Sequence, residues 1–165
     1  MAHILHGIGR LLKDRSRCKF YWLHLVWVLI LILYYLIVWM IIYSAGQEAS
    51  SYPFQRFCLH FLFLASMFIL SLLLFPDFPT DGSVDLRRHY FDTHRSFFGV
   101  WVVVFVSFGL DLLIWWGGLT LLSIELLPIY IFIVLSVTGA SVRNERFHAL
   151  LTAFFMANIL LFMVV

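Results

Sequence analysis

Five long apolar runs constrain the fold of this chain more than any other feature of its sequence. They cover residues 20–43, 54–75, 97–116, 119–138 and 147–165. The hydrocarbon core of a bilayer is about 30 Å thick, so a spanning helix needs about 20 predominantly apolar residues. Because each run has about this length, the sequence predicts an all-α membrane protein built as a bundle of five transmembrane helices. Only two glycines separate the third and fourth runs, which should therefore pair as an antiparallel hairpin.

The composition supports a membrane location and argues against other classes of protein. Hydrophobic residues make up 63% of the chain and charged residues 12%, whereas soluble domains are about half apolar and a quarter charged. The formal net charge of +2 gives no reason to expect a nucleic-acid partner. The two cysteines form neither a CxxC motif nor a metal-finger spacing. The lipid bilayer is the first partner that the sequence predicts.

The distribution of basic residues predicts the orientation of the bundle. Ten of the 11 Lys and Arg residues lie before the first run, between the second and third, or between the fourth and fifth. Arg56 is the exception. In a five-span topology these three segments fall on one side, and Lys and Arg accumulate on the cytoplasmic side of membranes. We therefore expect a cytoplasmic N-terminus and a C-terminus outside the cell.

This topology divides the chain into a basic cytoplasmic N-terminal segment, residues 1–19, and a single five-helix membrane domain, residues 20–165. Residues 76–96 are expected to form a cytoplasmic interfacial loop, in which Ser83 caps a helix because its hydroxyl can accept a hydrogen bond from a free backbone N–H. The loop also carries three arginines that are expected to contact lipid headgroups, namely Arg87, Arg88 and Arg95. Each basic residue near an anionic surface contributes about 1 kcal/mol.

The loop and its flanks resemble a family of small uncharacterised bacterial inner-membrane proteins. The resemblance rests on Leu73-Leu74-Phe75-Pro76, Gly82, Asp85-Leu86-Arg87, His89-Tyr90-Phe91, Arg95 and Phe97-Phe98. It implies a multi-pass protein of the cell inner membrane, and it implies no particular activity.

Ionisable residues inside the runs suggest a polar layer in the outer leaflet. His60, Asp111 and Glu125 each lie a few residues from the outer end of their run. At 1.5 Å per residue, all three fall roughly 8 to 10 Å below the outer boundary. We expect them to approach one another, within a protomer or across an oligomer interface, with Arg56 near the rim of the layer and Asn158 nearer the midplane. Such residues are costly inside a bilayer, so each needs a partner, water or a function.

Three interpretations of this layer stay open at this point. The carboxylates and the imidazole could pass or coordinate charge, or one histidine and two carboxylates could hold a divalent metal ion. Alternatively, a hydrogen-bonded group could simply fix the packing of the helices. A second metal candidate is weak because His89 and His94, five residues apart, fall on different faces of a helix. Neither metal candidate is favoured over the other interpretations, and we expect no metal ion and no other cofactor.

Two functions from different classes fit these features. The first is a homo-oligomeric proton or cation channel or transporter, because five short helices need self-assembly to enclose a pore. The alternative is a non-catalytic accessory or scaffolding subunit that binds another membrane protein. The sequence contains no GxSxG, HExxH, P-loop or Rossmann motif, so it does not predict an enzyme.

Overall fold

The computed structural model describes residues 2–48, 53–77, 83–115 and 119–164. Within these residues the helices are α1 (Ala2–Lys13), α2 (Trp22–Glu48), α3 (Phe54–Leu74), α4 (Leu86–Trp115), α5 (Leu127–Ser141) and α6 (Glu145–Val164). The shorter elements are the 3-10 helices η1 (Arg15–Arg17) and η2 (Ile124–Leu126) and the strands β1 (Cys18–Lys19) and β2 (Val84–Asp85). Helices α2 to α6 supply five candidate spans that are long and apolar enough to cross a membrane. The span formed by α5 also includes η2. The chain is thus a multi-pass, all-α membrane protein.

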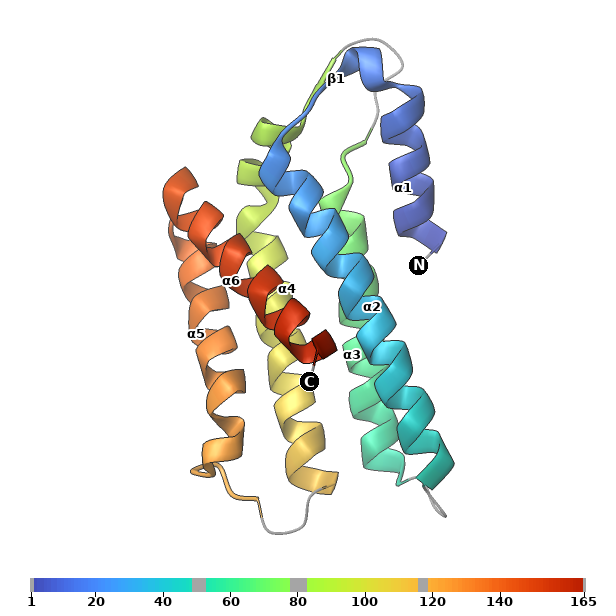
Figure 1. The fold of residues 1–165 in the computed structure, drawn as a ribbon, viewed down its shortest axis with the longest axis vertical. Coiled ribbons are helices and arrows are strands. Elements are labelled where there is room, and N and C mark those ends of the chain that lie inside the picture. The colour runs from blue at the N-terminus through green and yellow to red at the C-terminus, as the bar shows by residue number, and fades with distance from the viewer. Residues whose placement is uncertain (1, 49–52, 78–82, 116–118, 165) are drawn as a thin grey trace.

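The five spanning helices pack as a closed ring. Each helix contacts the next one in the sequence, and α6 contacts α2 to complete the ring. Figure 1 shows consecutive helices running in opposite directions, with α6 crossing obliquely in front of α4. Helices α4 and α5 are antiparallel neighbours, as the sequence predicted, although the two glycines that should form their turn lie outside the described residues.

Aromatic side chains join three helices of the ring across its interior. Trp27 of α2, Phe98 and Trp101 of α4 and Phe155 of α6 are each 0% exposed. The ring centroid of Trp27 lies 5.1 Å from that of Phe155 and 5.3 Å from that of Phe98. Edge-to-face pairs of this kind contribute about 0.5 to 1.5 kcal/mol beyond the burial of their area. We call these four residues the aromatic layer.

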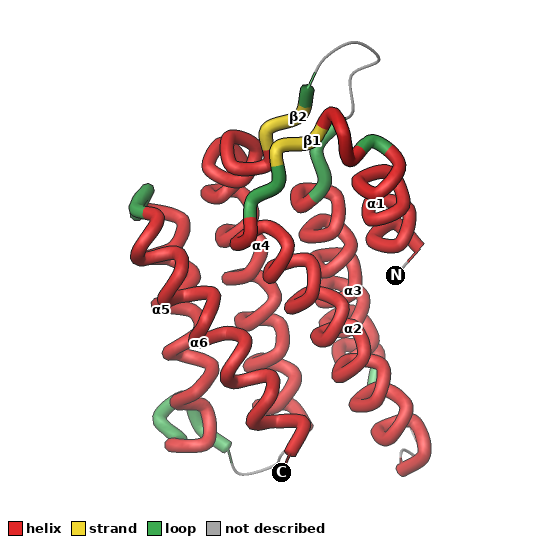
Figure 2. Tube along the Cα trace, turned by 45° about the horizontal axis from the view of Figure 1, so that its top comes forward, coloured by secondary structure: helices red, strands yellow, loops and turns green. Residues whose placement is uncertain are grey.

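One end of the bundle, which we call the basic end, collects the N-terminal segment and the basic connections. It carries α1, both strands, the start of α4 and the connection between α5 and α6 (Figures 1 and 2). The strands pair in parallel, with Cys18 opposite Val84 and Lys19 opposite Asp85. Because β1 precedes α2 and β2 precedes α4, this pairing holds the starts of two spanning helices side by side.

Helix α1 packs against α3 at the basic end. Its buried residues Ile4, Gly7 and Leu11 recur at helical spacing and form one face. A Cβ atom on Gly7 would lie 2.5 Å from the ring of Phe75, so only glycine permits this approach. The N-terminal segment is therefore a packed helix, not an extended basic tail.

The start of α4 lies inside the expected interfacial loop. Residues from Leu86 onward are already helical, and the helix continues without a break into the third span. Asp85 caps it, because its Oδ1 accepts hydrogen bonds from the backbone N–H groups of Arg87 and Arg88, both at 3.0 Å. These bonds lower the pKa of Asp85. The expectation that Ser83 is the cap was wrong, since Asp85 supplies a charged acceptor closer to the free N–H groups.

Helix α5 begins at Leu127, later than the start of the fourth apolar run. Pro128 lies in its first turn, where the missing N–H of proline has no helical partner to lose. The preceding residues form a turn and then η2. This late start determines where Glu125 lies.

Candidate functional site

A buried ion pair connects α3 to α4 near the end opposite the basic end. Nε of Arg56 donates a hydrogen bond to Oδ1 of Asp111 over 3.1 Å. Arg56 is 4% exposed and Asp111 is 7% exposed. A buried charge of this kind is stable only if it is paired. Asp111 thus provides the partner that Arg56 needs.

His60 completes this group, which we call the charged cluster. It lies one turn after Arg56 on the same face of α3, so both side chains reach α4. Its Nε2 is 3.5 Å from Oδ2 of Asp111, so the carboxylate faces Arg56 with one oxygen and His60 with the other. Three of the predicted polar residues are therefore brought together.

The other two residues of the predicted layer lie elsewhere. Glu125 is in η2 with an exposed side chain, and no ion pair among the described residues joins it to the charged cluster. The reason is the late start of α5, which leaves Glu125 in the turn before the helix. Asn158 lies on α6, in the wall of a cavity at the centre of the bundle.

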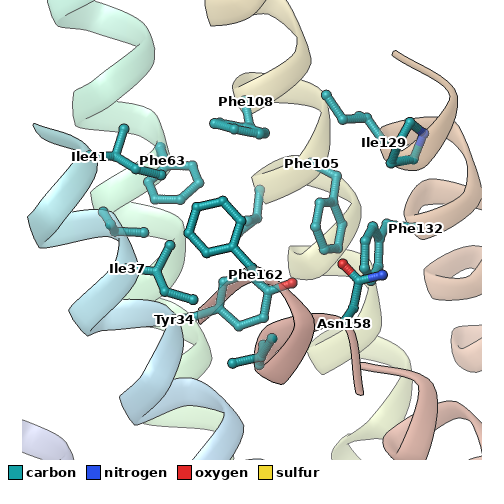
Figure 3. Close-up of a pocket in the computed structure, with 14 residues that line it drawn as sticks. Tyr34, Ile37, Ile41, Phe63, Phe105, Phe108, Ile129, Phe132, Asn158 and Phe162 are labelled. Carbon is teal, nitrogen blue, oxygen red and sulfur yellow. The ribbon is translucent and has the colours of Figure 1, made fainter. Parts of the chain in front are cut away.

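A central cavity of about 230 Å³ lies inside the ring of helices. All five spanning helices contribute to its wall, which consists of Tyr34, Ile37, Val38, Ile41, Phe63, Val104, Phe105, Phe108, Pro128, Ile129, Phe132, Asn158, Ile159 and Phe162. Figure 3 shows the labelled side chains surrounding a common space. Two of the rings, Phe105 and Phe132, stack with centroids 4.7 Å apart. The wall is apolar apart from two side chains.

Tyr34 and Asn158 are those two side chains. They come from α2 and α6, and Figure 3 shows the Tyr34 hydroxyl and the Asn158 amide directed toward the same part of the cavity. Within the described part of the chain, neither the Tyr34 hydroxyl nor the Asn158 amide takes part in a hydrogen bond. A phenol and a primary amide together offer donors and acceptors to a molecule in the cavity.

A smaller cavity of about 30 Å³ lies beside the charged cluster. His60, Asp111 and Ser107 contribute the polar part of its wall. It shares Val38, Ile41, Phe63 and Phe108 with the wall of the central cavity. Its volume is sufficient for a water molecule with several polar partners. The charged cluster thus lies directly behind one wall of the central cavity.

Tyr34 and the aromatic wall were not predicted from the sequence. Tyr34 lies within an uninterrupted apolar run, so its position along the chain does not distinguish it from a tyrosine at the interface. The ring closure between α2 and α6, which brings Tyr34 toward Asn158, is a tertiary feature with no local signal. Asn158 itself was identified because an amide is unusual within an apolar run.

Histidines of the basic end make bonds to the backbone. His89 donates from Nε2 to the carbonyl of Leu73 over 3.0 Å, and His94 bonds through Nδ1 to the carbonyl of Phe91 over 2.6 Å. Within the described ranges, no group of three or more His, Cys, Asp or Glu side chains is arranged to hold a metal ion. Both described cysteines, Cys18 and Cys58, are free thiols.

The arginines that were expected to contact lipid headgroups are exposed. Arg87 forms an ion pair with Glu145 at 2.8 Å, and Arg88 lies 3.6 Å from Asp92. Arg95 is also exposed, further along α4.

Comparisons of this chain with family models, with curated proteins and with solved structures give no match.

Proposed function

We propose that this membrane protein binds a small lipid-soluble molecule in its central cavity. The observation that carries the proposal is a cavity at the centre of the helix ring, lined by apolar side chains and by the polar groups of Tyr34 and Asn158. Sites for small ligands in membrane and soluble bundles share this design, with an apolar wall and few hydrogen-bonding groups.

The dimensions and chemistry of the cavity favour a ring-shaped ligand. An apolar cavity of about 150 Å³ can hold a benzene molecule, so 230 Å³ accommodates one six-membered ring with short substituents. The wall offers several aromatic faces, including those of Phe105, Phe108 and Phe132. Tyr34 and Asn158 are suited to a carbonyl or hydroxyl oxygen on that ring.

Binding of three probes to the purified protein in nanodiscs tests this proposal. Acetophenone has a ring and a carbonyl, ethylbenzene has the ring alone, and decanoic acid is linear. A ligand at 100 times its Kd stabilises the folded state by about 2.7 kcal/mol, so binding is measured as a rise in Tm. We expect acetophenone to raise Tm more than ethylbenzene does, and decanoic acid to have little effect.

Two variants on α6 provide the matched control. Asn158→Phe fills the cavity and should abolish the response to acetophenone. Leu160→Phe adds the same ring at a side chain that is 52% exposed on the outside of the bundle, and should preserve the response. Equal responses in both variants would show that the probe partitions into lipid or at the protein surface, and the proposal would be wrong.

A second candidate function, proton or cation movement by a homo-oligomer, is supported by the charged cluster. His60 and Asp111 line a cavity that is large enough for water, and both side chains can exchange protons. Within the described residues the aromatic layer lies between this cavity and the basic end, so a path would need an interface between copies of the chain. In proteoliposomes, Asp111→Asn should then abolish flux while Glu125→Gln, at an exposed position, should not. Absence of flux in the parent protein would exclude this candidate.

An accessory or scaffolding role is the alternative to both. It requires another membrane protein as the partner, whereas the transport candidate requires copies of this chain. Native mass measurement in mild detergent distinguishes a homo-oligomer from a complex with a second protein. The basic end and the resemblance to bacterial proteins support a location in the inner membrane with the N-terminus in the cytoplasm.

A further inference from the structure

An arginine-lined cavity lies at the basic end, separate from the central cavity. It has a volume of about 240 Å³ and is lined by Asp85, Arg87, Arg88, Phe91 and Arg143. Four of these residues belong to β2 and the first turns of α4. Arg143 comes from the connection between α5 and α6, so the cavity forms only when the two segments pack together.

The guanidinium groups around this cavity share few carboxylates. Arg88 and Arg143 both face Asp92, at 3.6 Å and 3.5 Å respectively. These distances are long for ion pairs, and each guanidinium has five N–H donors. One shared carboxylate therefore leaves donors on both arginines for a further anionic acceptor.

The remaining carboxylates near the cavity already have partners. Asp85 accepts the two backbone hydrogen bonds that cap α4. Glu145 binds Nη2 of Arg87 at 2.8 Å and accepts a hydrogen bond from Tyr21 at 3.1 Å. Asp92 is consequently the acidic group with which an incoming anion would compete.

The depth of the cavity identifies the source of that anion. The candidate spans Leu86–Ile114 and Glu145–Met163 begin beside it, and Ile124–Ser141 ends beside it. The arginines therefore lie outside the ends of the apolar runs, near the level expected for lipid phosphates. Phe91 contributes an apolar part of the wall, with the guanidinium carbon of Arg87 5.8 Å from its ring centroid.

We propose that Arg88 and Arg143, together with Arg87, bind the phosphate headgroup of an anionic phospholipid in this cavity. The phosphate accepts hydrogen bonds from the two guanidiniums that now share Asp92, and the acyl chains extend into the bilayer. Bidentate recognition of phosphate is a typical use of arginine. This site is independent of the ligand proposed for the central cavity.

Native mass spectrometry of the full chain with added phosphatidylglycerol or phosphatidylcholine tests the site. We expect phosphatidylglycerol to bind more tightly, and Arg143→Gln or Arg88→Gln to weaken it by about fivefold, in line with about 1 kcal/mol per basic residue. Both side chains are largely exposed, at 65% and 83%, so neither variant should prevent folding. Asp92→Asn should strengthen binding because it removes the competing carboxylate.

Arg146→Gln is the matched control. It makes the same change of charge at the start of α6, at an exposed position outside the cavity wall. We expect it to leave the affinity for phosphatidylglycerol unchanged. Equal weakening by Arg146→Gln and Arg143→Gln would overturn the proposal in favour of general surface charge. Displacement of phosphatidylglycerol by millimolar inorganic phosphate would overturn it in favour of a site for free phosphate.

Discussion

Arg56 and Asp111 lie 55 positions apart in the sequence and form a hydrogen-bonded ion pair at 3.1 Å inside the bundle. The pair connects the first turn of α3 to the last turns of α4, two helices that run in opposite directions (Figure 1). It therefore fixes both the register of these helices and their rotation about their axes.

Removing either partner of this pair should destabilise the fold strongly. We expect Asp111→Ala to lower the free energy of unfolding by roughly 3 to 5 kcal/mol, because it leaves the Arg56 charge buried without its carboxylate. The double variant Arg56→Leu, Asp111→Leu should recover most of this loss, since no isolated charge is left. Unfolding in mixed micelles measures these differences.

Gln55→Ala, at the exposed neighbouring position, provides a control and should have little effect. A double variant that is as unstable as Asp111→Ala would contradict the explanation by buried charge.

The packing of α1 on α3 should depend on Gly7. Gly7→Val places a methyl-bearing carbon against the ring of Phe75 and should release α1, which limited proteolysis of the N-terminal segment would detect. Gly9→Ala is the control, because a Cβ atom there has no neighbour within 4 Å. It should preserve or slightly strengthen the helix, since alanine has a higher helix propensity than glycine by about 1 kcal/mol. Equal protease sensitivity of the two variants would contradict this packing.

Alkaline pH should weaken the contact between Tyr21 and Glu145. Burial and the hydrogen bond to Glu145 raise the pKa of Tyr21 to about 12. The pKa of an unfolded tyrosine is about 10. The folded state thus holds the phenolic proton more tightly than the unfolded state does. The stability that protonated Tyr21 contributes is complete below pH 10 and declines as the pH rises toward 12.

Thermal unfolding between pH 8 and pH 12 tests this relationship. We expect Tm to fall less steeply above pH 10 in Tyr21→Phe than in the parent protein. Tyr43→Phe, at an exposed tyrosine, should leave the slope unchanged. If the Tyr21→Phe and parent curves are parallel, Tyr21 does not contribute to the pH dependence.

The orientation of the bundle can be measured by cysteine labelling. In a Cys18→Ser, Cys58→Ser background, Ser83→Cys lies at the basic end and Leu122→Cys at the opposite end, and both positions are exposed. From the distribution of Lys and Arg we expect a membrane-impermeant maleimide added outside intact cells to modify only position 122. Labelling of position 83 alone would show that the bundle has the opposite orientation.

The sequence was sufficient to predict the helical class and the approach of Arg56, His60 and Asp111. Both results depend on one-dimensional quantities, namely the length of an apolar run and the depth of a residue within it. Glu125 lies apart from this group within the protomer, because Pro128 is in the first turn of α5 and the helix begins after Glu125. A count of apolar residues does not show where within a run the helix begins.

The central cavity could not be predicted because it depends on which helices become neighbours. Tyr34 and Asn158 lie far apart in the sequence and line one cavity only because α6 closes the ring against α2. Hydropathy determines that a helix crosses the bilayer but gives no information about its neighbours. The parallel pairing of Cys18 with Val84 was missed for a related reason, since two-residue strands have no detectable periodicity.

That pairing also imposes an order on the assembly of the bundle. The chain between Cys18 and Val84 contains both α2 and α3, so the pairing of β1 with β2 closes a loop around a complete helical hairpin. During synthesis β2 emerges after both helices, so the strand pair can form only once residues 84–85 are available. The contact that holds the start of α4 beside the start of α2 is therefore made after the hairpin that separates them in the sequence has been synthesised.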